Sequence, residues 1–376
     1  MRIHDIDLYN YRNFDKLHLS FNDKCNLFVG ENGHGKTNLL ESLYMMGRGN
    51  SFRPTETKSF VNYESVRRES FIRGTLINKF ISYNTQILIQ DTKKKFRVNG
   101  KPISSTGLAR ILPVILFSPE SLSSIKGSSS ERRNLLDEMI LLNNPENADI
   151  LIRYQKALRA RNRVLKDYAS EHISKSQFED VFTSITEPFI QAAVDLTFVR
   201  IVTIRQMASE FQNALTKIFS YKVPSRIDYL VSSKVANDLT YEQIHDALHK
   251  RSLELRVAEV SSATSLVGPH RHDVEIYFDE KNSRFYCSQG QQRALILALK
   301  FAQIMYHHKV FQKYPVLLLD DVLSELDLDK KMNLLDLVGQ VDAQVFLTTT
   351  DRRFQEILKT EKYSLFEINK GIVTRK

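Results

Sequence analysis

The chain has 376 residues and a formal net charge of +9, which is enough length for two domains and enough positive charge to favour a polyanionic partner. Charge alone does not separate nucleic acid from an anionic membrane surface, or either of them from an ordinary basic protein. Only two cysteines, Cys25 and Cys287, occur and no apolar run approaches the length of a membrane span, so we expect a cytoplasmic protein without a disulfide framework or membrane contact.

The first predicted elements are strands at residues 2–9, 16–21 and 24–29. The third strand leads into a loop from Gly30 to Thr37 that fits the pattern G-x-x-x-x-G-K-[ST]. Residues 38–46 then place apolar side chains at helical spacing. A strand, such a loop and a helix in this order are typical of a phosphate-binding loop.

A phosphate loop gives a task to each of its parts. Its backbone N–H groups hold phosphates, Lys36 reaches the β and γ oxygens, and the Thr37 hydroxyl holds Mg²⁺. The positive end of the helix dipole also favours anions here. The alternative, an ordinary glycine-rich turn, leaves the flanking strand and helix unexplained. The residues predicted to bind the nucleotide are Gly30, Glu31, Asn32, Gly33, His34, Gly35, Lys36, Thr37 and Asn38.

Arg48 and Arg53 follow the first helix, in a stretch that fits a helix end and a loop, although phosphate contact is also open. An antiparallel meander is predicted next, with Asn99-Gly100 as a turn. Its strands are expected at residues 70–77, 82–90 and 95–98. The cations at one corner of the meander are Lys93, Lys94, Lys95 and Arg97. They form either a solvated turn or a DNA contact.

The middle of the chain changes to helical patterns after a buried strand at residues 113–117. Ser128 and Glu131 form a capping box that starts a helix. Apolar residues then recur every three or four positions over residues 151–168 and again over 190–218. This spacing predicts two long helices packed side by side, as a helical arm or lid.

The first of these long helices is strongly basic. Six basic residues and no acidic one lie between residues 153 and 166. Arg161 falls on the apolar seam, so we expect it to pack or pair inside the arm. The four cations that share one face are Lys156, Arg159, Arg163 and Lys166. Both a solvated helix face and contact with a polyanion are open for them.

The last part of the chain is predicted to contain a helix at residues 241–260 and strands at residues 273–278 and 283–287. Ser288 and Gln291 then form a local capping box at the start of a helix. Later strands are expected at residues 314–319 and, last, at residues 344–348. The segment after the last strand, residues 348–351, either senses a γ-phosphate or caps a helix.

The strand at residues 314–319 ends in two acids, Asp320 and Asp321. An apolar strand that delivers a carboxylate beside a phosphate loop is the arrangement with which P-loop proteins hold Mg²⁺. We therefore expect Asp320 to bind the metal and Asp321 to act as the base that orients the attacking water. Helix capping is the alternative role for these acids.

These motifs together resemble the ABC-type ATPase heads of the SMC class and, more closely, the RecF family of recombination-repair proteins. The motifs that carry the resemblance are residues 30–38, 116–120, 161–162, 268–273, 288–293 and 319–327. The resemblance implies an α/β fold, in which an ABC-type P-loop ATPase head with a mixed sheet and an antiparallel β meander carries an inserted α-helical lid or arm. We expect the head at residues 1–125 and 256–376 and the insertion at residues 126–255.

The resemblance also implies an ATP- and Mg²⁺-dependent homodimer that grips single-stranded DNA or gapped duplex. ATP on the loop of one subunit would be capped by a signature motif of the other. That motif would be Ser288, Gln289, Gly290, Gln291 and Gln292. The implied task is recombinational DNA repair and replication restart, with RecR and RecO as partners. Lys36 and Asp321 would be the catalytic residues, and Thr37 and Asp320 the metal ligands.

Three departures from the wider ABC pattern favour slow turnover. Asp321 stands where transporters have Glu, no Gln follows the strand that ends at Phe117, and no His follows the strand that ends at Thr348. We therefore expect a weak, DNA-stimulated ATPase that acts as a switch. The alternatives are a P-loop small-molecule phosphotransferase, a transporter ATPase subunit and a RecF-like ATPase of DNA defence. Residues 288–293 and 324–327 argue against the first, and the length of the insertion argues against the second.

Overall fold

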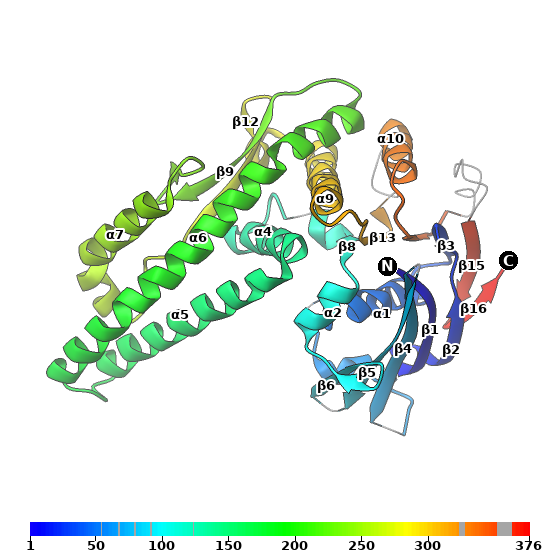
Figure 1. Ribbon diagram of the computed structural model, residues 1–376, viewed down its shortest axis with the longest axis horizontal. Helices are drawn as coiled ribbons and strands as arrows, with labels where there is room; N and C mark the ends of the chain where they lie inside the picture. Colours follow the sequence, from blue (N-terminus) through cyan, green and yellow to red (C-terminus); the bar gives the residue numbers. More distant parts are fainter. Residues whose placement is uncertain are drawn as a thin grey trace. The chain divides into compact units, whose positions relative to one another are not determined.

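The computed structural model describes residues 1–376 except Pro54, Arg67, Lys79, Asp91, Ser123 and residues 323–327 and 352–362 (Figure 1). The chain forms two compact units. The first contains Met1–Ser123, Asn213–Lys222 and Ser288–Lys376, and the second contains Ser124–Gln212 and Val223–Cys287. Within the described residues, every helix is too short or too polar to cross a membrane.

One sheet of the first unit is antiparallel and has the strand order β2-β1-β4-β5-β6-β7. Its strands are β1 (Arg2–Tyr11), β2 (Phe14–Ser20), β4 (Glu69–Asn78), β5 (Ile81–Gln90), β6 (Lys93–Val98) and β7 (Lys101–Pro102). Alternate residues of β1, such as Ile6 and Leu8, are buried, because successive side chains of a strand point to opposite faces. Asn99 and Gly100 both have positive φ, as the predicted hairpin turn requires.

The second sheet of this unit is mixed and has the order β16-β15-β3-β14-β13-β8. Its strands are β3 (Cys25–Val29), β8 (Val114–Phe117), β13 (Val316–Asp320), β14 (Val345–Thr349), β15 (Tyr363–Asn369) and β16 (Ile372–Arg375). The pairs β3–β14, β3–β15, β13–β14 and β13–β8 are parallel, and β15–β16 is antiparallel. Every residue of β3, β13 and β14 is buried, which is typical of parallel strands covered on both faces.

Helix α1 (Lys36–Arg48) contacts both sheets of the first unit, through β8, β13 and β14 of the mixed sheet and β5 of the meander. A single hydrophobic cluster joins residues such as Ile6, Leu43 and Leu318. Helix α1, which follows directly on the phosphate loop, is therefore held against two sheets. The other helices among the described residues of this unit are η1 (Thr57–Phe60), α2 (Ser105–Ile111), α3 (Pro119–Leu122), α9 (Gln289–Phe311) and α10 (Leu328–Gly339).

The second unit is mainly helical. Its helices are α4 (Ser129–Asn143), η2 (Pro145–Asn147), α5 (Ala148–Ala169), α6 (Lys175–Phe219), α7 (Tyr241–Ser262) and α8 (Ser283–Tyr286). The last turns of α6 belong to the first unit. A four-stranded sheet has the order β10-β9-β11-β12. Its strands are β9 (Ser225–Val231), β10 (Lys234–Val235), β11 (Asp273–Phe278) and β12 (Lys281–Asn282).

Helices α5 and α6 lie side by side in this unit, as the sequence predicted (Figure 1). Arg161 of α5 is fully buried between them and α7, where Glu259 accepts from its two terminal nitrogens at 2.9 and 2.8 Å. The guanidinium also lies 4.4 Å from the ring centroid of Phe182 on α6. The expectation that Arg161 pairs inside the arm is therefore confirmed.

The α/β class, the mixed sheet and the antiparallel meander are confirmed, but the strand predicted at residues 283–287 is wrong. Residues 283–286 form the short helix α8, because the Asn282 side chain accepts a hydrogen bond from the N–H of Arg284 and caps it. Phe285 and Tyr286 are 69% and 71% exposed, so they do not supply an inward face for a strand. Cys287 is therefore outside any strand, whereas Cys25 is buried in β3.

Two further expectations need revision. The strand at residues 344–348 is not the last, because β15 and β16 follow it. The second unit extends to Cys287, beyond the boundary expected at residue 255. The reason is that β11 pairs along its whole length with β9, and that Arg132 of α4 forms an ion pair with Asp273 at 2.7 Å.

Candidate functional site

The phosphate loop forms the bend between β3 and α1. Gly33 and Gly35 have φ angles of 80° and 115°, in the region that favours glycine. A Cβ atom on Gly35 would lie 2.5 Å from Nδ2 of Asn13 and 3.1 Å from Cζ of Phe14. Helix α1 begins at Lys36 without a side-chain cap and with no acidic residue in its first turn. Its first N–H groups therefore point toward a site suited to an anion.

The Lys36 ammonium is folded back onto this loop. Its Nζ donates to the carbonyl oxygens of Gly30 at 2.7 Å and Glu31 at 2.9 Å, and the residue is only 6% exposed. Burial lowers the pKa of Lys36, whereas the nearby carboxylates of Asp321 and Asp320 raise it. The negative charges of Asp320 and Asp321 therefore favour the protonated form of the Lys36 ammonium, against the effect of burial. Phosphate oxygens are stronger acceptors for it than the two carbonyls.

Thr37 contacts the acidic strand directly. Its Oγ1 donates to Oδ1 of Asp320 at 3.1 Å, although the two residues are 283 positions apart. Thr348, at the end of the neighbouring strand β14, donates to the same oxygen at 2.8 Å. Asp320 is 5% exposed. The structure therefore brings together the two residues predicted to hold Mg²⁺ and adds Thr348, which orients the carboxylate.

Asp321 follows at the end of β13 with a φ of 48°, in the left-handed region, which aspartate adopts more readily than most residues other than glycine. Its N–H donates to Oγ1 of Thr348 at 3.0 Å. This conformation bends the chain at the end of β13, where Asp320 contacts the phosphate loop through Thr37. The predicted motif at residues 324–327 lies outside the described residues. In the segment at residues 348–351, Oγ1 of Thr349 accepts a hydrogen bond from the N–H of Asp351 at 3.1 Å. The residues of the helix that this segment was expected to cap are not among those described.

Asn13 and Gly371, which no sequence motif indicated, help to hold the phosphate loop in place. The His34 carbonyl accepts from Nδ2 of Asn13 at 3.1 Å and from the N–H of Gly371 at 3.1 Å. Asn38 Nδ2 donates to Oδ1 of Asn13 at 2.8 Å. Asn13 comes from the turn between β1 and β2, and Gly371 from the turn between β15 and β16. Asn13 and Gly371 are distant from the loop in sequence, so no pattern within the loop points to them. Gly371 alone shows a local pattern, that of a glycine in a turn.

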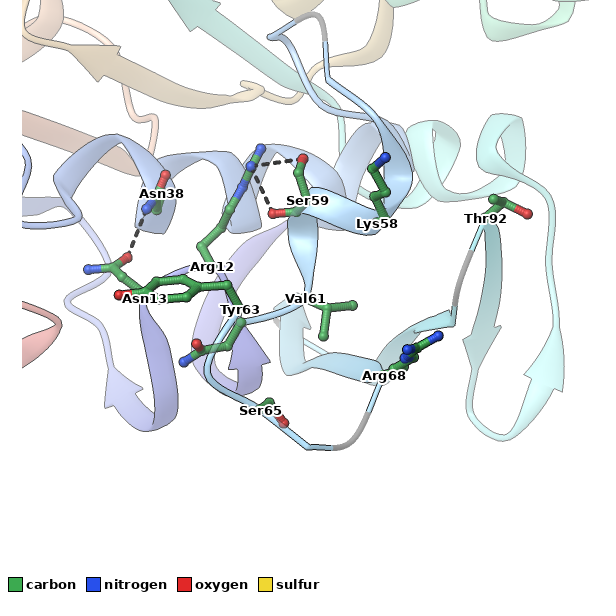
Figure 2. Close-up of a pocket in the computed structure, with 11 residues that line it drawn as sticks. Arg12, Asn13, Asn38, Lys58, Ser59, Val61, Tyr63, Ser65, Arg68 and Thr92 are labelled. Atoms are coloured by element: carbon green, nitrogen blue, oxygen red, sulfur yellow. Dashed lines mark hydrogen bonds between the residues drawn. The ribbon is translucent and has the colours of Figure 1, made fainter.

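A pocket of about 790 Å³ opens beside the loop (Figure 2). Its size falls in the range of small-molecule and cofactor sites. The charged residues that line it are Arg12, Lys58 and Arg68, and no acidic residue lines it among those described. The uncharged lining residues are Asn13, Asn38, Ser59, Val61, Asn62, Tyr63, Ser65 and Thr92. Asn38, which directly follows the phosphate loop and belongs to the predicted nucleotide-binding residues, also lines this pocket.

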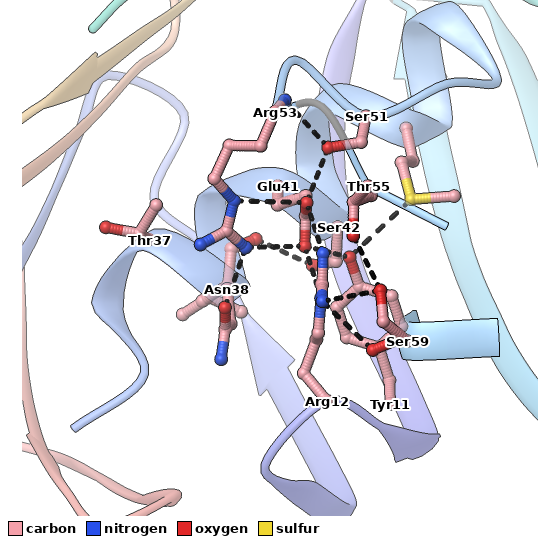
Figure 3. Close-up of polar contacts among 12 residues, drawn as sticks. Tyr11, Arg12, Thr37, Asn38, Glu41, Ser42, Ser51, Arg53, Thr55 and Ser59 are labelled. Atoms are coloured by element: carbon pink, nitrogen blue, oxygen red, sulfur yellow. Dashed lines mark hydrogen bonds and ion pairs between the residues drawn. The ribbon is translucent and has the colours of Figure 1, made fainter. Parts of the chain in front are cut away.

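A cluster of polar residues surrounds the buried Glu41 of α1, one turn beyond the loop (Figure 3). We call it the Glu41 cluster, and its members are Tyr11, Arg12, Glu41, Ser51 and Arg53. Arg53 thus pairs inside the first unit, beside the loop, and its Nη2 also donates to Oδ1 of Asn38 at 2.8 Å. Arg48 donates to the carbonyl of Val114 at 3.3 Å.

The predicted signature motif lies at the start of α9. Ser288 accepts from the N–H of Gln291 at 3.2 Å, and the Gln291 side chain accepts from the N–H of Ser288 at 2.8 Å. The local capping box is therefore confirmed. Ser288 and Gln289 are exposed, Gln292 is buried, and a Cβ on Gly290 would meet no described atom within 4 Å. The motif thus has a structural role and an open surface.

The basic residues predicted to bind DNA differ in how they are placed. On α5, Lys156, Arg159, Arg163 and Lys166 are all exposed, and Arg163 lies 3.6 Å from Asp167. These four cations form one exposed face of the second unit, in agreement with their helical spacing.

The three lysines of β6 do not share a face. Lys93 and Lys95 are exposed, whereas Lys94 points inward and donates to Oδ1 of Asn50 at 2.7 Å. Burial lowers the pKa of Lys94. Strand alternation accounts for the difference, and it places Arg97 with Lys93 and Lys95 on the outward face. Because side chains alternate between the two faces of a strand, the sequence alone could have predicted that Lys94 faces the opposite way from Lys93 and Lys95.

Three comparisons place this geometry among known proteins. Residues 2–374 match a family model described as the RecF/RecN/SMC N terminal domain. The protein named DNA replication and repair protein RecF from Enterococcus faecalis is 33% identical over 380 residues, which covers 100% of this chain and 99% of that protein. A similar protein of the same name from Oceanobacillus iheyensis is 30% identical, with coverage of 99% and 100%.

Solved structures give the same result for the fold. A structure of the recombination mediator protein RecF-ATPrS in the RecFOR pathway has a TM-score of 0.87 and 28% identity, and it covers 100% of this chain and 98% of that chain. The Smc head domain from Pyrococcus furiosus has a TM-score of 0.56 at 15% identity, with coverage of 100% and 95%. The second likeness concerns the fold alone, and it supports the ABC-type ATPase head expected from the sequence.

Proposed function

This chain belongs to the RecF family of DNA replication and repair proteins, and we propose that it is an ATP-dependent DNA-binding protein of recombinational repair and replication restart. The observation that carries the proposal is the 3.1 Å hydrogen bond between Thr37 and Asp320. It joins the phosphate loop to the acidic end of β13, as nucleotide hydrolysis by a P-loop protein requires. A glycine-rich turn or a helix cap would need no such contact.

ATP would bind with its phosphates on the loop and its nucleoside in the neighbouring pocket. The free N–H end of α1 and the Lys36 ammonium would hold the phosphates, and Lys36 would exchange its two carbonyl acceptors for phosphate oxygens. The pocket beside Asn38 has room for the base and ribose and lines them with cations and amides. Two solved relatives are described as RecF with ATP or ATPrS, which supports ATP as the nucleotide.

The residues at the loop also fit a magnesium ion. Hydroxyl and carboxylate oxygens are the ligands that Mg²⁺ prefers, and Thr37 and Asp320 present one of each to the phosphate site. When bound, the ion would neutralise charge on the β and γ phosphates. Thr348 would keep the Asp320 carboxylate oriented through its 2.8 Å hydrogen bond. Both hydrogen bonds to Asp320 are made by the protein itself, so its carboxylate is oriented before the ion and ATP bind.

Asp321 would act as the base that orients the attacking water. Burial lowers the pKa of Lys36, and the Asp321 carboxylate lies close enough to oppose that shift in part; the Asp321 backbone is fixed by the hydrogen bond to Thr348. Aspartate is one methylene shorter than the glutamate of fast ABC enzymes, so it reaches the water less well. We therefore propose a weak ATPase that works as a switch, and we propose from the family resemblance that DNA stimulates it.

A homodimer with ATP between its subunits would complete the site. Ser288, Gln289 and Gly290 present an uncovered helix start, and the N–H groups of a helix start attract phosphate. In a dimer this surface would cap the ATP held by the loop of the other subunit. Gln291 and Gln292 would instead support the motif from within.

The exposed cations of α5 and β6 are the candidate DNA contacts. In this proposal the second unit is the arm or lid and the first unit is the ATPase head. Two solved relatives are described as mediators in the RecFOR pathway, which supports RecR and RecO as partners, and the name DNA replication and repair protein supports DNA. Gapped or single-stranded DNA as the substrate is what the family resemblance implies. The cytoplasm is the compartment that suits this task.

The test of the proposal is ATP binding by the Lys36→Met variant, measured by isothermal titration calorimetry. Lys36 is the one side-chain charge that the loop offers to the phosphates, so we expect binding to be lost. Lys101→Met, which removes an exposed lysine of the same unit, is the matched control and should bind as the parent does. Unchanged ATP affinity in Lys36→Met would refute the assignment.

A further inference from the structure

Glu41 is a buried carboxylate that orients two arginines. Arg12 donates to both of its oxygens, through Nε and Nη2, at 2.8 Å each. Arg53 donates to the same two oxygens, through Nη2 at 2.8 Å and Nε at 3.3 Å. The hydroxyls of Ser51 and Tyr11 donate at 2.5 and 2.9 Å (Figure 3). A single acid thus fixes the orientation of two long cationic side chains.

Both arginines lead to the nucleotide site. Arg12 lines the 790 Å³ pocket, and its Nη1 donates to the carbonyl and hydroxyl of Ser59 at 2.9 and 3.1 Å (Figure 2). Arg53 donates to Asn38, and Asn38 donates in turn to Asn13, which donates to the His34 carbonyl of the loop. A continuous chain of hydrogen bonds therefore runs from Glu41 to the phosphate loop.

The charges of the cluster do not cancel. Two guanidinium groups share one carboxylate, and the side chains of Arg12 and Arg53 are 16% and 29% exposed. Burial opposes ionisation of Glu41, but hydrogen bonds from Arg12, Arg53 and Ser51 hold its pKa below the ordinary value. At neutral pH the acid is therefore charged, and the cluster keeps an excess positive charge beside the site of an anionic ligand.

We propose that Glu41 is a positioning residue for the nucleotide, which holds Arg12 at the pocket and fixes the loop through Arg53 and Asn38. This inference rests on the proposed function. Free arginine side chains lose conformational freedom when they bind a ligand, and this loss weakens binding. Glu41 restricts Arg12 before ATP arrives, so ATP meets an ordered cation.

The test compares ATP affinity in Glu41→Gln, Arg12→Ala and the double variant by isothermal titration calorimetry. Glutamine has the same shape but loses the charge and presents an amide donor to the guanidinium donors. We expect Glu41→Gln to raise the Kd for ATP about tenfold, as loss of a hydrogen bond to a charged group does. Because Glu41 acts in part through Arg12, the loss of affinity in the double variant should be smaller than the product of the two single fold-changes.

A purely structural role would give a different pattern. If Glu41 only stabilises the fold, the fold-changes of the two single variants should multiply in the double variant, and this result would overturn the inference. Hydrolysis supplies a second measurement. If Glu41 positions groups for binding, the Glu41→Gln variant should have a higher KM for ATP and a kcat near the parent value. A fall in kcat as large as the rise in KM would contradict this role.

The matched control is Glu259→Gln, which removes an equally buried carboxylate that pairs with an arginine in the second unit. Glu259 is 0% exposed and accepts from both terminal nitrogens of Arg161. The control should lower the melting temperature and leave the Kd for ATP unchanged. If it weakens ATP binding as much as Glu41→Gln, the effect is general destabilisation and the inference is wrong.

If Glu41→Gln does not fold, Glu41→Asp decides the question. The shorter acid keeps the charge but cannot reach both arginines at 2.8 Å, so a several-fold rise in Kd is expected and an unchanged Kd overturns the inference. The two hypotheses fail separately. Lys36→Met with normal ATP affinity refutes the proposed function, whereas loss of binding in Lys36→Met with parental affinity in a folded Glu41 variant refutes only the role of Glu41.

Discussion

Removal of the four exposed cations of α5 should weaken DNA binding and reduce its dependence on salt. The variant changes Lys156, Arg159, Arg163 and Lys166 to alanine. Each phosphate neutralised on duplex DNA contributes a slope of about −0.9 to a plot of log K against log salt. Arg163 already lies 3.6 Å from Asp167, so three or four cations are available to phosphates. The slope should therefore become shallower by roughly 2.7 to 3.6 units.

The assay is fluorescence anisotropy with labelled duplex and gapped DNA at several salt concentrations in the presence of ATP. The affinity should fall by a similar factor for different sequences, because phosphate contacts do not read bases. The control variant changes four exposed lysines on other elements of the same unit, which are Lys175, Lys234, Lys250 and Lys281. It removes the same charge, so a loss confined to the α5 variant identifies the face rather than the net charge.

The meander is the competing site. Of the three lysines of β6, only Lys93 and Lys95 face outward with Arg97, so the variant that tests the meander changes Lys93 and Lys95 and leaves Lys94 in place. If the α5 variant keeps the parental slope while the meander variant loses it, the DNA path runs over the head and our reasoning about α5 is refuted.

The remaining predictions concern the ATP site and the second unit. Ser288→Arg should bind ATP as the parent does but fail to dimerise with ATP in sedimentation experiments, and loss of both properties would favour the purely local capping role. Asp321→Asn should retain ATP and accumulate the dimer, whereas Asp320→Asn should weaken Mg²⁺ binding; parental hydrolysis by both variants would contradict these roles. Burial lowers the pKa of His270 and, further, of His272 from the ordinary value of 6.5, so the unfolded chain binds more protons than the folded chain below that pH. Stability should therefore fall as the pH drops through 6.5, by at most about 1.4 kcal/mol per pH unit for each histidine, and a melting temperature that is constant between pH 7.5 and 5.5 would oppose this assignment.

Local pattern was sufficient wherever a residue's role depends on its neighbours in sequence. The glycines and Lys36 of the phosphate loop, the strand that ends at Asp320 and the seam position of Arg161 could all be predicted in this way. Each of them can be recognised from the order and spacing of residue types within a short stretch of sequence. The capping box at Ser288 belongs to the same class.

Contacts between distant elements could not be predicted from such patterns. Glu41 lies on α1 with apolar neighbours and looks like an ordinary helix residue, and its burial is possible only because Arg12 and Arg53 arrive from other segments. The same is true of Thr348, which meets Asp320 through the pairing of β13 with β14. The false strand at residues 283–287 had apolar residues, but Asn282 capped a helix there and left Phe285 exposed.

The strand that leads into the phosphate loop has consequences for synthesis of the protein. Cys25 of β3 pairs with Val345 on one side and with Tyr363 on the other. Both neighbours are made more than 300 positions later, and at typical rates of translation this interval is roughly 15 to 60 s. During that time β3 has no sheet to join, and its apolar side chains are open to chaperones and to aggregation. The nascent head therefore acquires its ATP site only after the arm segment has been made, so a ribosome that stalls within the arm would release a chain that cannot hold ATP.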